Sequence, residues 1–415
     1  MSHPFLSLSY TELTKLIASR APRSTRRRVK KFLRVHGEHM EQLFLCSAFK
    51  ILQQQIQDGF KALQGMRGLD VPEIPYMEIP REFVRFFHCK MVAAICTVMA
   101  CKLGMSVRRT SELAASGACH DLGHGLFGHT SERMLQAIFA DHKHHEVLTK
   151  EIVLSNKELY GVFTKLRISA YAVARIINEE GRSGGVQRVS DTLGWTACDS
   201  LMARFFGVAN ATVENALAYI GSVISSIVDV RRDRVLVVTS SAPIQKLVNT
   251  RTLMFRDLYR SQMSEQAQLT MTTFMGYAFK NGMLTREDIY SAELHEHDLV
   301  RKLAGLASEV QGHVGQWLCD LLALPTTLVL PKGRWETRTF ADDDSAQAWF
   351  DELAPHVREF AILGPKQNGR KLVKKYKILL PAGEQLTIGP DPSVIQTAKE
   401  LDVPFVLTPT FTPSS

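Results

Sequence analysis

The stretch Ala118-Cys-His-Asp-Leu-Gly-His-Gly-Leu-Phe-Gly-His-Thr-Ser-Glu132 brings together the imidazoles of His120, His124 and His129 and the carboxylates of Asp121 and Glu132. It contains no lysine or arginine. Such a cluster is what a divalent metal and a proton-transfer site require. Core histidines and helix caps are the alternative interpretation, but they leave the repeated spacing of His120, His124 and His129 unexplained.

A complete metal centre needs more ligands than this stretch provides. His120 and Asp121 are adjacent, and His88 lies in a mostly apolar helix predicted over 82–103. Asp191 follows a glycine-containing loop and opens an apolar helix, which makes it the best candidate for a fourth ligand. Two imidazoles with two carboxylates suit a first-row divalent metal such as Mn, Fe, Co, Ni or Zn, with positions left for water and a phosphate oxygen.

The second half of the stretch indicates acid–base chemistry. His129 and Glu132 are three positions apart at the start of a predicted helix, so the carboxylate can reach the imidazole and raise its basicity. A helix N-terminal acid that interacts with the helix dipole is the alternative for Glu132. His124 lies about one helical turn from His120 and can contact a phosphate. The polar segment 141–146 is equally well explained as an exposed helix start.

Composition bounds the class of protein. Of the 415 residues, 45% are hydrophobic and 22% are charged, as in an ordinary globular protein. The formal net charge of +8 favours anionic partners, although a solvated basic surface is the commoner explanation. Seven cysteines without a Cys-x-x-Cys pair predict buried reduced thiols. Because no apolar run reaches transmembrane length and no signal pattern begins the chain, we expect a cytoplasmic protein with no membrane contact.

Helical spacing dominates the sequence up to about residue 325, and β-branched or alternating segments follow. We therefore expect a mostly α protein, with a helical body over 1–325 and a small α+β C-terminal subdomain over 326–415.

Local signals within these parts give three further predictions. A helix is predicted over 156–178 and a polar loop over 179–185. The segments 360–363 and 372–380 flank a Pro-Lys-Gln-Asn-Gly-Arg turn, which predicts a β-hairpin.

Two basic runs suggest a different class of function. Arg23-Ser-Thr-Arg-Arg-Arg-Val-Lys-Lys-Phe-Leu-Arg34 is explained either by a solvated helical face or by a contact with phosphate. A second run extends from Lys366 to Lys377. Both runs motivate a non-catalytic nucleic-acid-binding regulator as an alternative, although that function leaves the ligand set unexplained.

Three sequence segments resemble one known family. Arg85-Phe-Phe-His88, the His120-Asp121 stretch and Asp191 resemble the H…HD…D signature of the HD superfamily. The extended His-Asp-Leu-Gly-His-x-x-Phe-Gly-His-x-x-Glu form is similar to the deoxyguanosine triphosphate triphosphohydrolases and their SAM-domain dNTPase relatives. The flanking segments Ser47-Ala-Phe-Lys-Ile-Leu-Gln53 with Gln57, and Asp191-Thr-Leu-Gly-Trp195-Thr-Ala-Cys-Asp199, agree with this family.

The resemblance implies an HD-domain helical bundle over roughly 40–205 and a role for each matching residue. Trp195 departs from the family's usual tyrosine, which removes a hydroxyl near the sugar. The implied metal ligands are His88, His120, Asp121 and Asp191, and the implied catalytic dyad is His129 with Glu132. The implied phosphate contacts are Arg85, His124 and His145. The implied deoxyribose contacts are Gln57, Trp195 and Asp199. The later phosphate-binding arginine of the family could correspond to Arg231, Arg232, Arg234 or Arg251.

The function implied by this resemblance is metal-dependent hydrolysis of deoxynucleoside triphosphates, dGTP or a broader set, to deoxynucleoside and tripolyphosphate. The cofactor would be a divalent metal, with Mn, Mg, Fe, Co, Ni and Zn all open. A homo-oligomer, an effector nucleotide and single-stranded nucleic acid are the further partners to be expected. The alternative enzyme is another HD phosphohydrolase, either a nucleotidase or a phosphodiesterase acting on nucleic acid or a signalling nucleotide.

Overall fold

The computed structural model describes residues 8–54, 85–139, 141–205, 212–254, 275–294, 335–354, 375–391 and 405–409, with single positions at 296, 299, 302, 305, 358, 362 and 363. Gln57 and the predicted boundary near residue 325 lie outside these residues. Helices form most of the described chain and the strands are short, so the predicted mostly α class is confirmed. In chain order the helices are α1 (Tyr10–Ser19), α2 (Arg23–Phe44), the 3-10 helix η1 (Ser47–Phe49), α3 (Lys50–Gln54), α5 (Arg85–Lys102), α6 (Val107–Cys119), α7 (His129–Ile138), α8 (His145–Ser155), α9 (Lys157–Leu166), α10 (Ala170–Ile177), α11 (Gly181–Phe205), α12 (Val213–Ser226), α13 (Ala242–Met254), α15 (Arg286–Ile289) and α18 (Asp343–Glu352).

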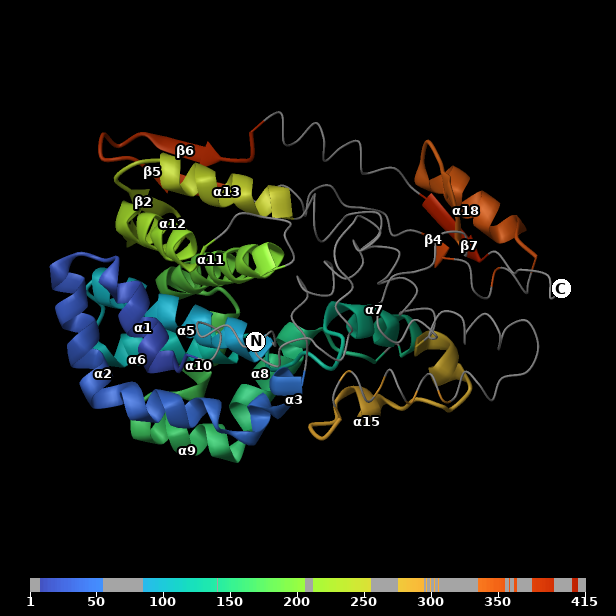
Figure 1. Ribbon diagram of the computed structural model, residues 1–415, viewed down its shortest axis with the longest axis horizontal. Helices are drawn as coiled ribbons and strands as arrows, with labels where there is room; N and C mark the ends of the chain where they lie inside the picture. Colours follow the sequence, from blue (N-terminus) through green and yellow to red (C-terminus); the bar gives the residue numbers. More distant parts are fainter. Residues whose placement is uncertain are drawn as a thin grey trace.

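The strands form two small sheets. A four-stranded sheet has the order β1-β2-β5-β6, and a three-stranded sheet has the order β3-β7-β4. The strands are β1 (Ile227–Val230), β2 (Leu236–Val238), β3 (Trp335–Thr339), β4 (Ile362–Leu363), β5 (Tyr376–Leu379), β6 (Gln385–Ile388) and β7 (Phe405–Pro409). In the first sheet β2 pairs in parallel with β5, so the predicted helical body contributes strands that join it to the C-terminal part. Figure 1 shows this sheet beside α13, and α18 with β4 and β7 at the opposite end of the molecule.

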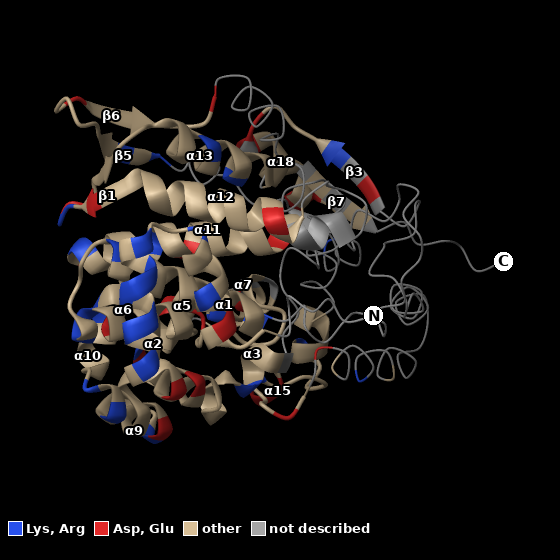
Figure 2. Ribbon diagram, turned by 60° about the vertical axis from the view of Figure 1, so that its left-hand side comes forward, with Lys and Arg blue, Asp and Glu red and all other residues tan. Residues whose placement is uncertain are grey.

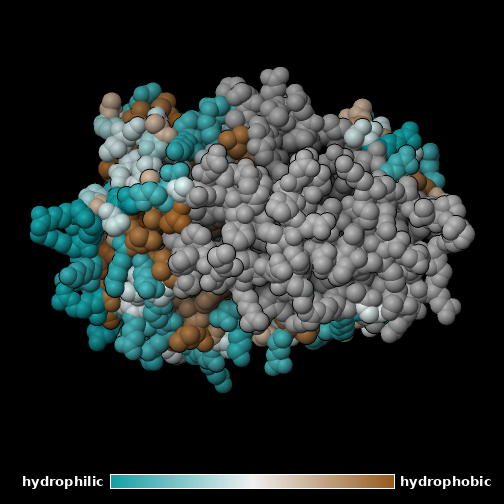
Figure 3. All heavy atoms as spheres, in the orientation of Figure 1, coloured by the Kyte–Doolittle hydropathy of each residue, from teal (hydrophilic) through white to brown (hydrophobic). Residues whose placement is uncertain are grey.

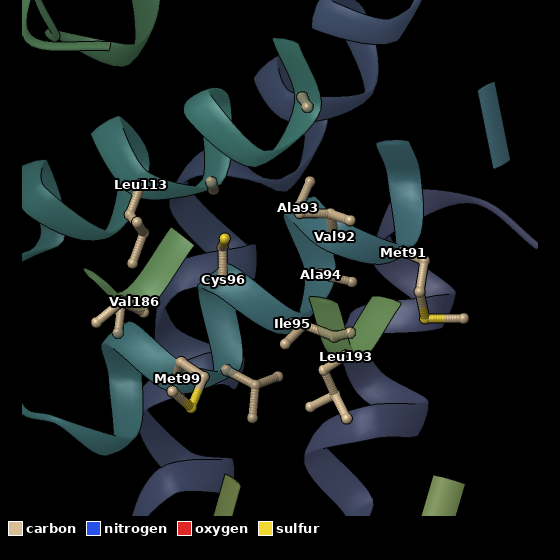
Figure 4. Packing of buried hydrophobic residues seen from close by; sticks show 14 of the residues in the cluster. Met91, Val92, Ala93, Ala94, Ile95, Cys96, Met99, Leu113, Val186 and Leu193 are labelled. Atoms are coloured by element: carbon tan, nitrogen blue, oxygen red, sulfur yellow. The ribbon is translucent and has the colours of Figure 1, made fainter. Parts of the chain in front are cut away.

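Helix α5 is the centre of the main hydrophobic core. Every residue from Met91 to Cys101 is buried, because α1, α2, α6 and α11 all pack against this helix. Figure 4 shows Cys96 and Met99 of α5 in one cluster with side chains of α6 and α11. The N-terminal turn of the same buried helix carries the polar residues Arg85 and His88, so both are held inside the molecule.

Two of the predicted local boundaries were wrong. The helix predicted over 156–178 is divided into α9 and α10, because Arg167 adopts a left-handed conformation with φ 56° and ends α9. The loop predicted over 179–185 overlaps α11, which begins at Gly181. Helix α11 packs against β1 and its neighbouring helices, and this tertiary contact outweighs the low helix propensity of the glycines at its start.

The predicted hairpin was also wrong. Strand β4 pairs with β7 in the three-stranded sheet, whereas β5 pairs with β6 and β2 in the four-stranded sheet. The hairpin in this region is β5–β6, whose turn contains Gly383 with φ 84°. The signal at the Asn-Gly turn was therefore assigned to the wrong pair of strands.

A second, smaller hydrophobic cluster supports the loop before α7. It combines residues from two distant parts of the chain, which Figure 1 shows where α7 lies near α15. The members are Leu126, Phe127, Met134, Leu135, Met275, Ala278, Leu284, Ile289 and Leu299. The loop between α6 and α7 is thus held by the main core on one side and by this cluster on the other.

The described cysteines agree with the predicted thiols. Cys46, Cys89, Cys96, Cys101, Cys119 and Cys198 are buried and form no disulfide, while Cys319 lies outside the described residues. Among the helices that the structure describes, none combines the length and apolarity that a membrane span requires.

Candidate active site

Three helices bring the predicted metal ligands together. His88 comes from α5, His120 caps the C-terminus of α6, and Asp191 lies in α11. The Nε2 atoms of His88 and His120 are 3.1 Å apart. Oδ1 of Asp191 lies 3.3 Å from the first of these nitrogens and 3.2 Å from the second. Residues that are more than a hundred positions apart in sequence therefore present their ligand atoms to one point.

Asp121 completes this group. Its Oδ1 lies 3.5 Å from Nε2 of His120, and its Oδ2 lies 3.9 Å from Nε2 of His88 and accepts a 2.8 Å hydrogen bond from Arg85. Nδ1 of His120 lies 2.9 Å from the carbonyl oxygen of Gly117. Because a carbonyl only accepts, Nδ1 carries a proton, so Nε2 is the ring atom that would bind a cation.

The donor set fits a divalent cation. Ligand atoms bound at about 2.1 Å to one ion are separated by roughly 3 Å, and the three closest atoms of this group have that spacing. His88, His120 and Asp121 are all buried, and their ligand atoms lie within 4.8 Å of one another. Neutral imidazoles and ionised carboxylates are the forms that bind such a cation.

The ionisable side chains of this group shift one another's pKa. Burial alone would lower the pKa of His120, but the carboxylates of Asp121 and Asp191 outweigh it and raise that pKa to about 9. Burial would raise the pKa of Asp121, but His120 and Arg85 hold it well below its usual value. In the same way His120 and His88 hold the pKa of Asp191 down against burial. The raised pKa of His120 means that its imidazolium compensates part of the charge of these two carboxylates.

A second group of histidines adjoins the metal-ligand group. The ring of His124 stacks on that of His145, with centroids 3.8 Å apart and an interplanar angle of 17°. The ring of His129 lies 4.7 Å from that of His124 and 5.2 Å from that of His145. Nε2 of His124 is 3.7 Å from Oδ1 of Asp121, so the two groups form one continuous polar site.

Glu132 interacts closely with His145. Its carboxylate accepts a 2.6 Å hydrogen bond from the His145 backbone N–H, and Nδ1 of His145 lies 3.0 Å from its other oxygen. Burial would raise the pKa of Glu132, but the hydrogen bond and charge of His145, with a smaller effect of His129, lower it to about 2. The pairing of Glu132 with His129 as a dyad stays a prediction, and the structure adds His145 as a direct partner of this carboxylate.

His124 is the most deeply buried histidine of the second group. Its side chain is 1% exposed, and burial together with the charges of Arg85 and His145 holds its pKa well below the usual value. His124 is therefore neutral at physiological pH, so it can give one hydrogen bond and accept one.

Gly123 allows this close arrangement of histidines. A Cβ atom at this position would lie 2.1 Å from the carbonyl oxygen of His145 and 2.6 Å from the backbone nitrogen of Thr149. The N–H of Gly123 also donates to Oγ1 of Thr149 over 2.8 Å. The glycine between the two histidines of the motif therefore lets α8 approach and bring His145 to the site.

The expected sugar contacts lie along α11. Asp191, Trp195 and Asp199 follow one another at intervals of four residues, which places them on one side of the helix. Trp195 is half-buried and Asp199 is 1% exposed. Their role with a sugar stays a prediction, and the third expected contact, Gln57, lies outside the described residues.

The four arginines that were candidates for the later phosphate-binding arginine differ in their exposure. Arg231, Arg232 and Arg234 are exposed around the turn between β1 and β2. Arg251 of α13 is 8% exposed, and burial lowers its pKa to about 10 against the opposing effects of Tyr376 and Asp191. Only packing shows that Arg251 lies within electrostatic reach of the predicted metal ligand Asp191.

Comparisons with known proteins relate part of this chain to one domain family. The family model described as "HD domain" matches residues 85–206. Over 99 residues the chain is 34% identical to a "deoxyguanosinetriphosphate triphosphohydrolase-like protein" of Bradyrhizobium sp. (strain ORS 278), covering 23% of this chain and 25% of that protein. A protein of the same description from Rhodopseudomonas palustris (strain HaA2) is 31% identical over 99 residues, covering 23% of this chain and 24% of that protein. The match thus spans about a quarter of the length of these relatives.

Solved structures share the fold over a larger part of the chain. A phosphohydrolase from Bacteroides thetaiotaomicron has a TM-score of 0.62 at 14% identity, covering 88% of this chain and 94% of that one. A hypothetical protein from Aquifex aeolicus has a TM-score of 0.56 at 15% identity, covering 88% and 95%. At these identities the likeness concerns the fold alone. Residues 85–206, which carry both histidine groups, therefore match the HD domain family.

Proposed function

We propose that the protein is a metal-dependent phosphohydrolase that converts deoxynucleoside triphosphates to deoxynucleoside and tripolyphosphate. The observation that carries the proposal is the 3.7 Å approach of His124 to Asp121, which joins a metal-ligand group to a group of histidines. The names of the two relatives, which refer to deoxyguanosine triphosphate, support this substrate class.

The first group of residues would hold the cation. His88, His120, Asp121 and Asp191 are its ligands in this proposal. When bound, a divalent cation supplies Lewis-acid activation of a phosphate oxygen and of water.

Buried cationic and imidazole groups would bind the triphosphate. A triphosphate carries about four negative charges, so its binding requires positive charge in addition to one dication. Arg85 is 4% exposed and lies directly beside Asp121, and Arg251 approaches the same region from α13. His124 and His145 present stacked rings next to these charges, and we assign both to phosphate oxygens.

Proton transfer would come from the second group. Water attacks the α-phosphorus, the bond from phosphorus to the nucleoside 5′-oxygen breaks, and that oxygen needs a proton to leave. We assign this proton transfer to His129. The carboxylate of Glu132 and the imidazole of its partner His145 lie next to His129 and would set its electrostatic environment. The water oxygen then ends in tripolyphosphate.

Product analysis tests the proposal. The chain is incubated with each dNTP and Mn²⁺ or Mg²⁺, and the phosphate product is identified. Tripolyphosphate with deoxynucleoside is the expected result for wild type, with loss of turnover in His129→Ala and retention in the matched loop variant His142→Ala. Pyrophosphate or orthophosphate would move the assignment to another HD phosphohydrolase, a nucleotidase or a phosphodiesterase. Unchanged turnover in His129→Ala would contradict the role of His129.

The basic face of α2 favours nucleic-acid binding as a second candidate function. The basic residues of its N-terminal half are all exposed: Arg23, Arg26, Arg27, Arg28, Lys30, Lys31 and Arg34. Figure 2 shows them as blue segments along α2, and Figure 3 shows a hydrophilic surface at the same end of the molecule. Glutamine at four of these positions should weaken binding of a single-stranded oligonucleotide and flatten its salt dependence. Salt-dependent binding without hydrolysis of any nucleotide would favour a regulator over an enzyme.

A further inference from the structure

A turn in an unfavourable backbone conformation joins the two histidines that follow the metal motif. It consists of Leu126, Phe127 and Gly128, between His124 and His129. Phe127 has φ 65° and Gly128 has φ 54°. The left-handed region is unfavourable for phenylalanine, at a cost of about 1–3 kcal/mol, so surrounding contacts must hold this conformation.

The contacts that hold the turn come from a distant segment. The N–H of Leu126 donates to the carbonyl oxygen of Ile289 over 2.8 Å. The N–H of Phe127 donates to Oε1 of Glu296 over 2.6 Å. Glu296 is 0% exposed, although it is an acidic residue. The carboxylate that accepts this hydrogen bond therefore lies outside residues 85–206, the range that matches the HD domain.

A buried carboxylate at this position has a strong effect on the backbone. Burying a charge is costly unless hydrogen bonds satisfy it, and a hydrogen bond from a backbone N–H to a carboxylate is about twice as strong as a neutral one. The side chains of Leu126 and Phe127 pack in the second hydrophobic cluster with Ile289, so the turn is fixed on both sides. Rotation of the Phe127 peptide would lose the Glu296 contact and shift the start of α7 at His129.

We propose that Glu296 is a positioning residue, which fixes the Leu126–Gly128 turn and thereby sets the placement of His124 and His129 in the site. This inference rests on the proposed function for the roles of the two histidines. It assigns to the segment after α15 a part in the reaction that the HD domain by itself does not contain. We expect its effect mainly in the histidine group, because His88 and Asp191 lie on α5 and α11 and His120 caps α6.

Three variants of the full chain test the proposal. Glu296→Ala removes the acceptor, Glu296→Gln keeps an acceptor oxygen, and Glu293→Gln changes an exposed neighbour as the matched control. For each we measure Mn²⁺ content, hydrogen exchange of the peptide 124–129, and kcat and KM for the preferred dNTP. In Glu296→Ala we expect at least 10-fold faster exchange, a kcat lower by about 100-fold and a KM changed by less than about 3-fold, since small misplacement of reacting groups costs about that much.

The other outcomes separate this proposal from a general structural role. We expect Glu296→Gln to recover kcat to within about 10-fold of wild type, with Mn²⁺ content equal in all variants. Loss of Mn²⁺ together with kcat in Glu296→Ala would assign Glu296 to overall folding and overturn the proposal, as would wild-type exchange of the peptide. If wild type itself hydrolyses no dNTP, the proposed function fails, while hydrogen exchange still decides whether Glu296 fixes the turn.

Discussion

The hydroxyl of Tyr376 donates a 3.0 Å hydrogen bond to Oγ1 of Thr192, and both residues are buried. Tyr376 belongs to β5, near the C-terminus, whereas Thr192 follows the predicted metal ligand Asp191 in α11. Oγ1 of Thr192 in turn donates to the backbone carbonyl of Arg188, one turn earlier in the same helix. The C-terminal strand is therefore attached to the helix turn that presents Asp191.

Removing the Tyr376 hydroxyl should destabilise the fold. Tyr376→Phe keeps the ring and loses one buried hydrogen bond, so we expect the free energy of unfolding to fall by about 1 kcal/mol. Denaturant titration measures it, with Tyr160→Phe as the control because Tyr160 is 67% exposed. In a double-mutant cycle with Thr192→Val the two effects should be non-additive. Strict additivity would show that the bond contributes no coupling.

Glu132 should make folding stability depend on pH in the acid range. Its pKa is lowered from 4.5 to about 2 in the folded protein, so its contribution is fully present above pH 4.5 and is lost as pH falls toward 2. The shift corresponds to about 3 kcal/mol at neutral pH. Thermal unfolding of wild type and Glu132→Gln should therefore differ most near pH 7 and converge toward pH 2. Glu146→Gln, at a side chain that is 71% exposed, is the control, and a difference that persists unchanged to pH 2 would contradict the assignment.

A divalent cation should stabilise the fold through the first histidine group. After chelation, addition of Mn²⁺ at a hundred times its Kd should raise the free energy of unfolding by about 2.7 kcal/mol. Asp191→Asn removes a ligand carboxylate that lies 3.2 Å from His120, so it should abolish most of this gain. His142→Gln, in the loop before α8, should retain it. Unfolding temperature and metal content measured together check the prediction, and a full gain in Asp191→Asn would exclude Asp191 as a ligand.

Gly123 should tolerate no side chain. In Gly123→Ala the new Cβ would meet the backbone of α8 at 2.1 Å, so α8 must shift and we expect a loss of about 3 kcal/mol or more. Gly161, in α9, has open space at the same position, and Gly161→Ala should stabilise the protein by about 0.5–1 kcal/mol. Denaturation midpoints of the two variants should thus move in opposite directions. A Gly123→Ala variant as stable as wild type would show that α8 can be displaced without cost.

Some features follow from sequence because they depend on spacing within one element. The buried character of α5 follows from its apolar residues on every side, and the spacing of Asp191, Trp195 and Asp199 places them along one side of α11. Predictions that needed the pairing of distant strands failed, as the hairpin did, because the partner of β5 lies at 236–238 and cannot be inferred from a local turn. The motif residues 85, 88, 120, 121 and 191 were recognisable as one set by their identity, without knowledge of their distances.

The sequence by itself determined the residue types of the site and the mostly α class, since helical periodicity and the His-Asp motif are both patterns of residues close together in the sequence. Only the tertiary structure showed that Arg251 is buried while its three counterparts are exposed, that His145 contacts Glu132, and that Glu296 contacts the Phe127 turn. The physical reason is that these contacts depend on how helices pack. Packing is set jointly by side chains scattered along the whole chain, whereas residue spacing constrains only neighbours within one helix or strand.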